Sequence, residues 1–228
     1  MTPAPIPIIE LEDPLAYLPH RPIIEVRRDA VIYDQADEGN GLYLLLRGRV
    51  ALARRTLGET EVVLDVLGKD QLFGFGGLLY LERRIERAIA LEPCSIMFWT
   101  TDDILQQIER EPKLGVALIQ AVATRTMDDL SRIQALSGQT TPERLVHTLL
   151  LFAGRFGRNG HDGATELPHL THKLLSDCVG TSREVVTAQM NRLRRKGYLT
   201  YSRRATRLNV ESIQEALRNG LLRESHAD

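Results

Sequence analysis

Residues 170–209 read LTHKLLSDCVGTSREVVTAQMNRLRRKGYLTYSRRATRLN, and this stretch decides the fold of the C-terminal part of the chain. Its first half has three apolar residues at helical spacing, which are Leu174, Leu175 and Val179. Thr171 stands where an N-cap is needed, because its hydroxyl can accept from a free N–H of the first turn. Gly180 then allows the positive φ of a sharp turn. The pattern predicts a helix followed by a tight turn.

A second helix is predicted to start at Thr181–Ser182 and to stop at Gly197. Its expected buried stripe consists of Val185, Val186, Met190 and Leu193. Residues 198–210 then alternate like a β-hairpin, with three arginines near its tip, which are Arg203, Arg204 and Arg207. A helix-turn-helix followed by a basic wing suits the phosphate-lined groove of double-stranded DNA.

The same segment also has a plainer interpretation, in which its charged side chains only face solvent or cap the helix. Arginines on the outer face of a helix are usually only solvated, and Glu184, three residues after Thr181, also fits the far end of a capping box. Five arginines and a lysine nevertheless gather here, which are Arg192, Arg194, Arg195, Lys196, Arg203 and Arg204, whereas the whole chain has a net charge of -1. This asymmetry favours a nucleic-acid surface.

Composition sets the class of protein. A chain of 228 residues with 43% hydrophobic content is long enough for two cores. No apolar run reaches membrane-spanning length, and the start (Pro3, Pro5, Pro7) lacks the pattern of a signal peptide. Cys94 and Cys178 stand alone and form no disulfide framework. We therefore expect a cytoplasmic chain without a membrane partner, in which both cysteines are small buried hydrophobes.

Short apolar runs separated by turns indicate an antiparallel β structure from about residue 22 to residue 99. The predicted strands are residues 31–33, 42–46, 50–53, 62–67, 88–91 and 96–99. The predicted turns are residues 38–41, 47–49, 57–59 and 67–70, each with a glycine. A closed or sandwiched sheet of this size can hold one small ligand.

Helices follow the strands. Thr101-Asp102-Asp103 is expected to cap a first helix, and Lys113–Leu136 is expected to form a second one of roughly 24 residues, about 36 Å long. Within the second, five residues repeat at coiled-coil spacing, which are Ile119, Ala123, Thr126, Leu130 and Ile133. This seam packs either on the chain's own β domain or on a partner helix; its narrowness favours a homodimer. Residues 138–142 (GQTTP) are expected to break the helix and to act as a hinge.

The order of these motifs resembles the cyclic-AMP receptor protein/FNR family of transcription regulators, from about residue 20 to about residue 210. Residues 39–48, 68–74 and 180–186 carry the resemblance, together with Arg144 after Pro142. It implies an α+β fold with an N-terminal antiparallel β-roll (residues 1–110), a long dimerisation helix (111–137) and a C-terminal winged helix-turn-helix (138–228).

The resemblance also implies the DNA-binding residues. These are Thr171, Thr181, Ser182, Arg183, Glu184, Thr187, Ala188, Arg192, Arg203 and Arg204. Arg183 would contact guanine and Glu184 would accept from cytosine, while Ser182 would contact a phosphate. Ala188 stands where the receptor proteins often have another arginine. RNA polymerase is an expected partner, with the exposed loop at residues 155–162 as a candidate contact.

The effector pocket departs from the cyclic-AMP-binding pattern. Phe75 stands where an acid is expected, and Ile85 follows Arg84 where the cyclic-AMP-binding members have a serine. The Asp129 carboxylate would repel a cyclic phosphate. Arg84 and Arg125 are similar to the arginine pair with which the family's nitrogen-control regulators hold 2-oxoglutarate. We expect no response to cyclic AMP and consider a small anionic effector at Gly74, Phe75, Gly76, Arg84 and Arg125. The alternative is that Arg84 pairs with Glu82 or Glu86 and Arg125 with Asp128 or Asp129, without any ligand.

Other chemistry has little support in the sequence. The chain lacks four cysteine ligands for an iron–sulfur cluster, and His169 and His172 form only an isolated pair. No metal, cofactor or catalytic arrangement is expected, so the chain is not predicted to be an enzyme. The sequence also fits a second class of protein, a small-anion sensor whose winged domain docks protein rather than DNA.

Overall fold

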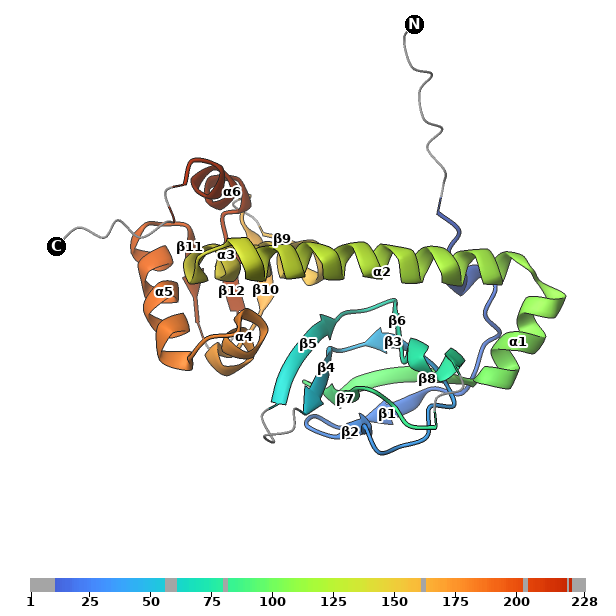
Figure 1. The fold of residues 1–228 in the computed structure, drawn as a ribbon. Helices are drawn as coiled ribbons and strands as arrows, with labels where there is room; N and C mark the ends of the chain where they lie inside the picture. Colours follow the sequence, from blue (N-terminus) through green and yellow to red (C-terminus); the bar gives the residue numbers. More distant parts are fainter. Residues whose placement is uncertain are drawn as a thin grey trace, which may run out of the picture.

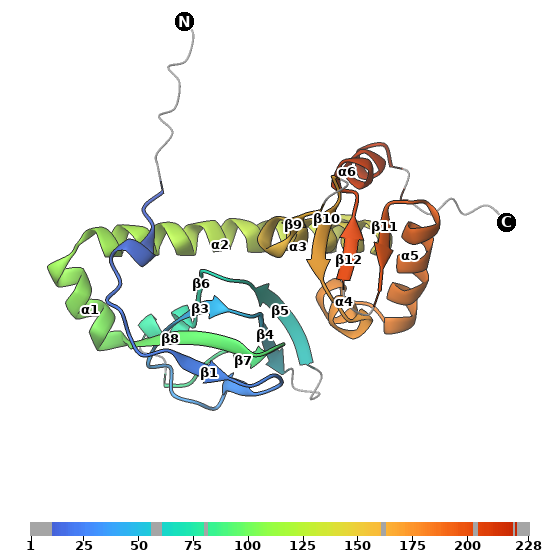
Figure 2. The ribbon, with the colours of Figure 1, turned by 180° about the vertical axis from the view of Figure 1, so that it is seen from behind.

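The computed structural model describes residues 11–55, 61–79, 82–160, 163–202, 205–220 and 222. The β-roll lies along one side of one long helix, α2 (Lys113–Gly138), and the C-terminal domain lies at the far end of this helix (Figure 1). The reverse view shows the same arrangement, with the C-terminal sheet facing the viewer (Figure 2). Among the described residues, no helix is long and apolar enough to cross a membrane.

The β-roll consists of two four-stranded antiparallel sheets. One has the order β1 (Ile24–Val26), β8 (Cys94–Thr100), β3 (Gly41–Arg47) and β6 (Gln71–Phe73). The other has the order β2 (Val31–Tyr33), β7 (Arg87–Ala90), β4 (Val50–Arg55) and β5 (Glu61–Leu67). All six predicted strands are confirmed. The sequence interpretation missed β1 and β6, which are the two edge strands of the first sheet.

A β-bulge interrupts the pairing of β4 with β5. Leu52 faces Asp65 and Ala53 faces Val63, so Leu64 has no partner residue across the ladder. Because β5 lies at the edge of its sheet, the backbone around Leu64 is open to neighbouring elements. The turn predicted at residues 57–59 lies outside the described residues.

The helix α1 (Thr101–Arg110) connects the β-roll to α2. Two 3-10 turns belong to the N-terminal part: η1 (Pro14–Ala16) precedes β1, and η2 (Phe75–Leu79) lies between β6 and β7. Thr100 caps α1 in a capping box with Asp103, one residue earlier than predicted. The long helix is confirmed and extends to Gly138, with Leu114, Ala117 and Leu118 buried at its N-terminal end.

The C-terminal domain begins after Gln139 and Thr140. Its elements in order are α3 (Thr141–Phe156), β9 (Arg158–Asn159), β10 (Thr165–Pro168), α4 (His172–Val179), α5 (Arg183–Arg195), β11 (Leu199–Tyr201), β12 (Ala205–Leu208) and α6 (Val210–Arg218). The strands form one sheet in the order β11-β12-β10-β9. The predicted helix, turn, helix and hairpin are all present. The division into residues 1–110, 111–137 and 138–228 stays a prediction.

The packing of the recognition-helix segment differs from expectation at one residue. Val186, Met190 and Leu193 are buried in the domain core, but Val185 is 39% exposed. Val185 lies in the first turn of α5, outside the set of α5 residues that the core buries. Gly180 has a φ of 69°, as its turn requires.

The β-roll and the C-terminal domain are in direct contact. Val66 of β5 is buried in the same hydrophobic cluster as Leu149 of α3 and Leu175 of α4. On the polar side, Arg49 pairs with Glu92 at 2.9 Å and donates to the carbonyl of His169 at 3.3 Å. The β-roll therefore touches the C-terminal domain through both apolar and charged groups.

Candidate nucleic-acid interface and effector site

The start of α5 is built by Ser182 rather than by Thr181. Ser182 is the N-cap, and its hydroxyl accepts from the backbone N–H of Val185 at 3.3 Å. The capping box considered between Thr181 and Glu184 is therefore absent. A hydrogen bond from its own backbone N–H and one from the Ser182 hydroxyl lower the pKa of the exposed Glu184 carboxyl. Glu184 is thus a charged acceptor at the helix terminus.

The predicted DNA-contacting residues fall into three groups. Thr171, Ser182, Arg183, Glu184 and Ala188 are exposed, and Thr181, Thr187 and Arg192 are half-buried. Arg203 and Arg204 lie outside the described residues. Thr171 also caps α4, since its hydroxyl accepts from the N–H of Leu174 at 3.1 Å.

His172, the first residue of α4, is a member of this surface that the sequence interpretation missed. Its Nδ1 lies 2.8 Å from the Thr187 hydroxyl, and its ring meets that of Tyr201 edge-on at 5.6 Å. Tyr201 in turn donates to Asn191 at 2.9 Å and carries the Arg194 guanidinium over its ring. Burial lowers the pKa of His172, and the charges of Arg183 and His169 lower it further. The only sequence signal was a histidine next to the N-cap.

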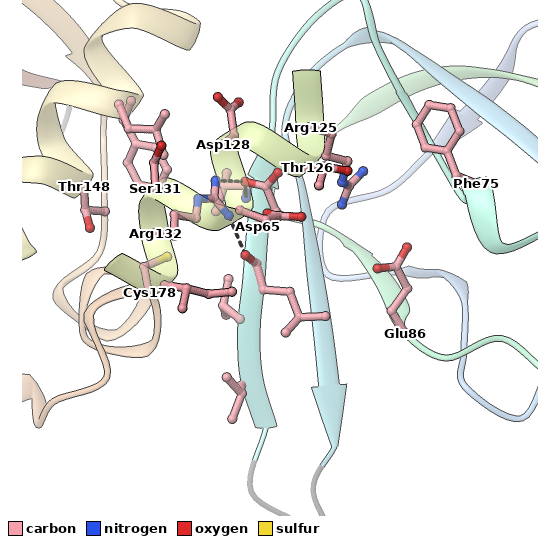
Figure 3. A pocket seen from close by; sticks show the side chains of 18 of the residues that line it. Asp65, Phe75, Glu86, Arg125, Thr126, Asp128, Ser131, Arg132, Thr148 and Cys178 are labelled. Atoms are coloured by element: carbon pink, nitrogen blue, oxygen red, sulfur yellow. Dashed lines mark hydrogen bonds and ion pairs between the residues drawn. The ribbon is translucent and has the colours of Figure 1, made fainter. Parts of the chain in front are cut away.

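A cavity of about 660 Å³ lies between β5, α2 and the C-terminal domain (Figure 3). One end holds the expected effector residues Gly74, Phe75, Gly76, Arg84 and Arg125. The other end reaches the α3 and α4 side chains Thr148 and Cys178. The five expected residues therefore do share one cavity.

Arg84 is buried at its end of this cavity. Its guanidinium lies 4.0 Å from the centre of the Tyr33 ring and donates to the carbonyl of Gly41 at 3.3 Å. Gly74, with a φ of 83°, allows this arrangement, because a Cβ there would lie 3.1 Å from the Arg84 Nη1. Within the described residues Arg84 forms no ion pair with Glu82 or Glu86, so this considered pairing of Arg84 is wrong. Its partners are an aromatic ring and a carbonyl.

Arg125 reaches the cavity from α2 and faces Glu86 and Phe75 (Figure 3). It makes no ion pair with Asp128 or Asp129 in the part of the chain that is described; Asp128 instead pairs with Arg155 at 3.1 Å. Glu86 accepts from Tyr33 at 3.0 Å. Burial and Glu86 raise the pKa of Tyr33, while Arg84 and Arg125 act in the opposite direction. Both arginines thus lie within electrostatic reach of the Tyr33 hydroxyl.

The predicted seam of α2 is exposed along its whole length. Ile119 is 71%, Leu130 55% and Ile133 58% exposed, and Ala123 and Thr126 are exposed as well. Val116, Val122 and Met127 widen this apolar face. The possibility that the seam packs on the chain's own β domain is therefore wrong, and the described chain leaves this face uncovered.

The loop considered for RNA polymerase is less exposed than predicted. The side chain of Arg155 is only 11% exposed, because it pairs with Asp65 and Asp128, and Phe156 packs on the C-terminal core. Residues 161–162 lie outside the described residues. Only Arg158 and Asn159 are fully exposed in the rest of the segment.

Within the described residues no group of histidine, cysteine and acidic side chains can hold a metal ion. Cys94 is buried, and its thiol donates to the carbonyls of Arg49 and Glu92. Cys178 is half-buried rather than buried, and desolvation raises its thiol pKa to about 12. Neither thiol is therefore a reactive thiolate at neutral pH.

Comparisons with known proteins agree with this geometry. Residues 23–111 match the cyclic nucleotide-binding domain, and residues 143–216 match the Crp-like helix-turn-helix domain. The global nitrogen regulator of Nostoc sp. is 26% identical over 178 residues, covering 77% of this chain and 80% of the relative. The cyclic AMP receptor protein of Thermus thermophilus is 28% identical over 190 residues, covering 83% and 85%.

Solved structures show the same fold. FixK2 from Bradyrhizobium japonicum superposes with a TM-score of 0.75 at 17% identity, covering 90% of this chain and 98% of the other. The c-di-GMP-responsive global regulator CLP of Xanthomonas campestris has a TM-score of 0.70 at 20% identity, covering 85% and 95%. A cyclic-nucleotide-binding-like β-roll joined to a winged helix-turn-helix defines a DNA-binding transcription regulator. The chain belongs to the cyclic-AMP receptor protein/FNR (Crp/Fnr) family.

Proposed function

We propose that this regulator works as a homodimer that binds a palindromic operator through α5. The observation that carries the proposal is the exposed apolar face of α2, where Ile119 is 71% and Leu130 55% exposed within a run of residues at coiled-coil spacing. A two-fold axis along α2 would present two recognition helices to two half-sites about 34 Å apart.

Base recognition is assigned to the first turn of α5. Arg183 and Glu184 are exposed next to the capped N-terminus, while Val186 and Met190 anchor the opposite side in the core. A guanidinium matches guanine O6 and N7, and a carboxylate accepts from cytosine N4. Ser182 and Thr171 at two helix N-termini are suited to phosphate contacts. The protein-docking alternative has no observation in its favour.

We propose that cyclic AMP is not the effector. Phe75 provides no acceptor for a ribose hydroxyl, and Glu86 and Asp129 bring negative charge to the cavity where a cyclic phosphate would lie. Arg84 already has a ring and a carbonyl as partners. A small anion would therefore depend on Arg125, whose guanidinium has no ion-pair partner among the described residues. A ligand-free regulator is the remaining alternative.

RNA polymerase is the proposed partner on the promoter, as for other regulators that bind operator DNA, and the cytoplasm is the proposed location. Enzymatic activity is not proposed, since the relatives named above are regulators.

Selection of bound DNA from a random pool tests the proposal. We expect an enriched palindrome, bound by two chains in sedimentation analysis, with the same sequence recovered with and without cyclic AMP. Enrichment of a single, non-repeated site bound by one chain would contradict the dimeric proposal. No enrichment, with protein captured instead, would support the docking alternative.

A further inference from the structure

Asp65 of β5 is the carboxylate at which the β-roll, α2 and the C-terminal domain meet. Its side chain is only 4% exposed, and it accepts from Arg132 of α2 and from Arg155 of α3. Arg155 also donates to the carbonyl of Val66 at 3.0 Å and to Asp128 of α2 at 3.1 Å. We call Asp65, Asp128, Arg132 and Arg155 the Asp65 cluster.

The bulge in β5 supplies a further bond to this cluster. Leu64 is outside the strand ladder, and its free carbonyl accepts from Nη1 of Arg132 at 2.6 Å. Arg132 therefore contacts two consecutive residues of β5, and Figure 3 shows Asp65 and Arg132 together on the cavity wall. Two arginines that each make more than one charge-assisted bond fix orientation more strictly than a single point contact does.

The cluster also lies on the same stripe of α2 as the effector end of the cavity. Arg125, Asp128 and Arg132 are three and four residues apart, which places them on one face of the helix. A change in the position of α2 at Arg125 would therefore move Asp128 and Arg132 against Arg155.

We propose that Asp65 is a positioning residue for DNA binding: acting through Arg155, it sets the orientation of the C-terminal domain on α2. The inference rests on the proposed dimer, because orientation is measured by the distance between two recognition helices. A fixed orientation accepts one half-site spacing, whereas a domain freed from β5 and α2 accepts several.

The test measures how strictly the protein selects the half-site spacing. Operators with the selected half-sites and a spacer lengthened or shortened by one or two base pairs are compared with the native spacing, at one salt concentration. Asp65→Asn and Arg155→Lys are the variants. Asp70→Asn is the matched control, because this carboxylate follows β5, is 52% exposed and has a backbone conformation that asparagine tolerates.

We expect both variants to bind a single half-site as the wild type does, and to lose about tenfold of the preference for the native spacing. The double variant Asp65→Asn/Arg155→Lys should lose less than the product of the two single losses, since the two residues share one contact. The control should keep the wild-type preference.

One outcome would contradict the role of Asp65, and another would contradict the dimeric operator. If the wild type prefers one spacing and both variants keep that preference while their half-site binding is normal, the positioning role of Asp65 is wrong. If the wild type itself is indifferent to spacing, the dimeric operator of the proposed function is wrong. Should Asp65→Asn not fold, Arg155→Lys alone decides, because it keeps the charge and removes only the fork geometry.

Discussion

The Thr187 hydroxyl on the recognition helix lies 2.8 Å from Nδ1 of His172 on the preceding helix. The same hydroxyl donates to the carbonyl of Arg183 at 2.8 Å, so it has no second proton to give. His172 must then donate from Nδ1, which assigns the tautomer of a neutral ring. The contact joins the N-terminus of α4 to the turn of α5 that carries Arg183.

His172 should make folding sensitive to mild acid. Burial, with Arg183 and His169, holds its pKa below the ordinary value of 6.5, so the unfolded chain takes up the proton first as the pH falls. Part of the stability is therefore present above that value and lost below it. Urea unfolding at about pH 7.5 and about pH 5.5 should show a larger loss for the wild type than for His172→Gln. His20→Gln, at an exposed position, is the control. Equal losses in wild type and His172→Gln would contradict the prediction.

Arg183→Ala should remove sequence preference while weak, salt-dependent DNA binding remains. Losing a bidentate contact to guanine costs about 1–3 kcal/mol at one base position. The ratio of affinities for the selected operator and a scrambled duplex measures it. Arg195→Ala removes the same charge at the far end of α5 and should weaken both duplexes alike. A ratio that Arg183→Ala leaves unchanged would limit Arg183 to a phosphate contact.

Leu130→Asp should separate the proposed dimer into monomers. Leu130 lies in the middle of the apolar face of α2, so two like charges would meet across the two-fold axis. Sedimentation should give the mass of one chain, and operator affinity should fall by about 100-fold or more because the half-sites are no longer linked. Thr124→Asp, an exposed position off the seam, is the control. A variant dimer of normal strength would place the interface elsewhere.

Calorimetry should detect no binding of cyclic AMP, and any binding of a small dicarboxylate such as 2-oxoglutarate should depend on Arg125. Arg125→Gln should lower the affinity for the anion by about 10- to 100-fold, because a charge-assisted hydrogen bond contributes roughly 1.5–3 kcal/mol. Circular dichroism should show an intact fold, since Arg125 is only half-buried. Tight cyclic-nucleotide binding would overturn the interpretation of the pocket, whereas binding of neither ligand would support the ligand-free alternative.

Gly180→Ala and Gly74→Ala should lower the stability of the fold by different amounts. Gly180 has a φ of 69° and free space around it, so Gly180→Ala should cost only the left-handed conformation, about 1–2 kcal/mol. Gly74→Ala should cost about 1–3 kcal/mol more, because its Cβ would lie 3.1 Å from Arg84 and Tyr43 and 3.2 Å from the Gly41 carbonyl. Thermal unfolding of both variants measures the difference, and equal melting temperatures would contradict it.

The elements that the sequence predicted correctly are those with a local signal. Gly180 and the stripe of Val186, Met190 and Leu193 depend on residues close to one another in the chain, and so do the six strands and α2. Val185 was misplaced, because helical spacing alone does not say how wide a buried stripe is. The cap of α1 was misplaced by one residue, since the hydroxyls of Thr100 and Thr101 are equally good acceptors for a backbone N–H of the first turn.

The interactions that the sequence missed join residues far apart in the chain. Asp65 and Arg155 are 90 residues apart, and Arg49 and His169 are 120 apart, so no spacing rule connects them. The same holds for Arg84, whose expected acidic partners were its neighbours in sequence and whose real partners are Tyr33 and Gly41. The sequence predicted which side chains carry charge, and only the fold decides which of them meet.

Leu64 is an extra residue in β5, because no residue of β4 pairs with it. Side chains alternate between the two faces of a sheet with a period of two, so the residues before and after Leu64 follow two different phases. Deleting Leu64 would leave Val63 opposite Ala53 and Asp65 opposite Leu52, so the bulge would become a regular ladder in which every side chain keeps its face. The strand itself would tolerate the deletion, and the loss would fall on α2, because Arg132 would no longer have the Leu64 carbonyl as an acceptor.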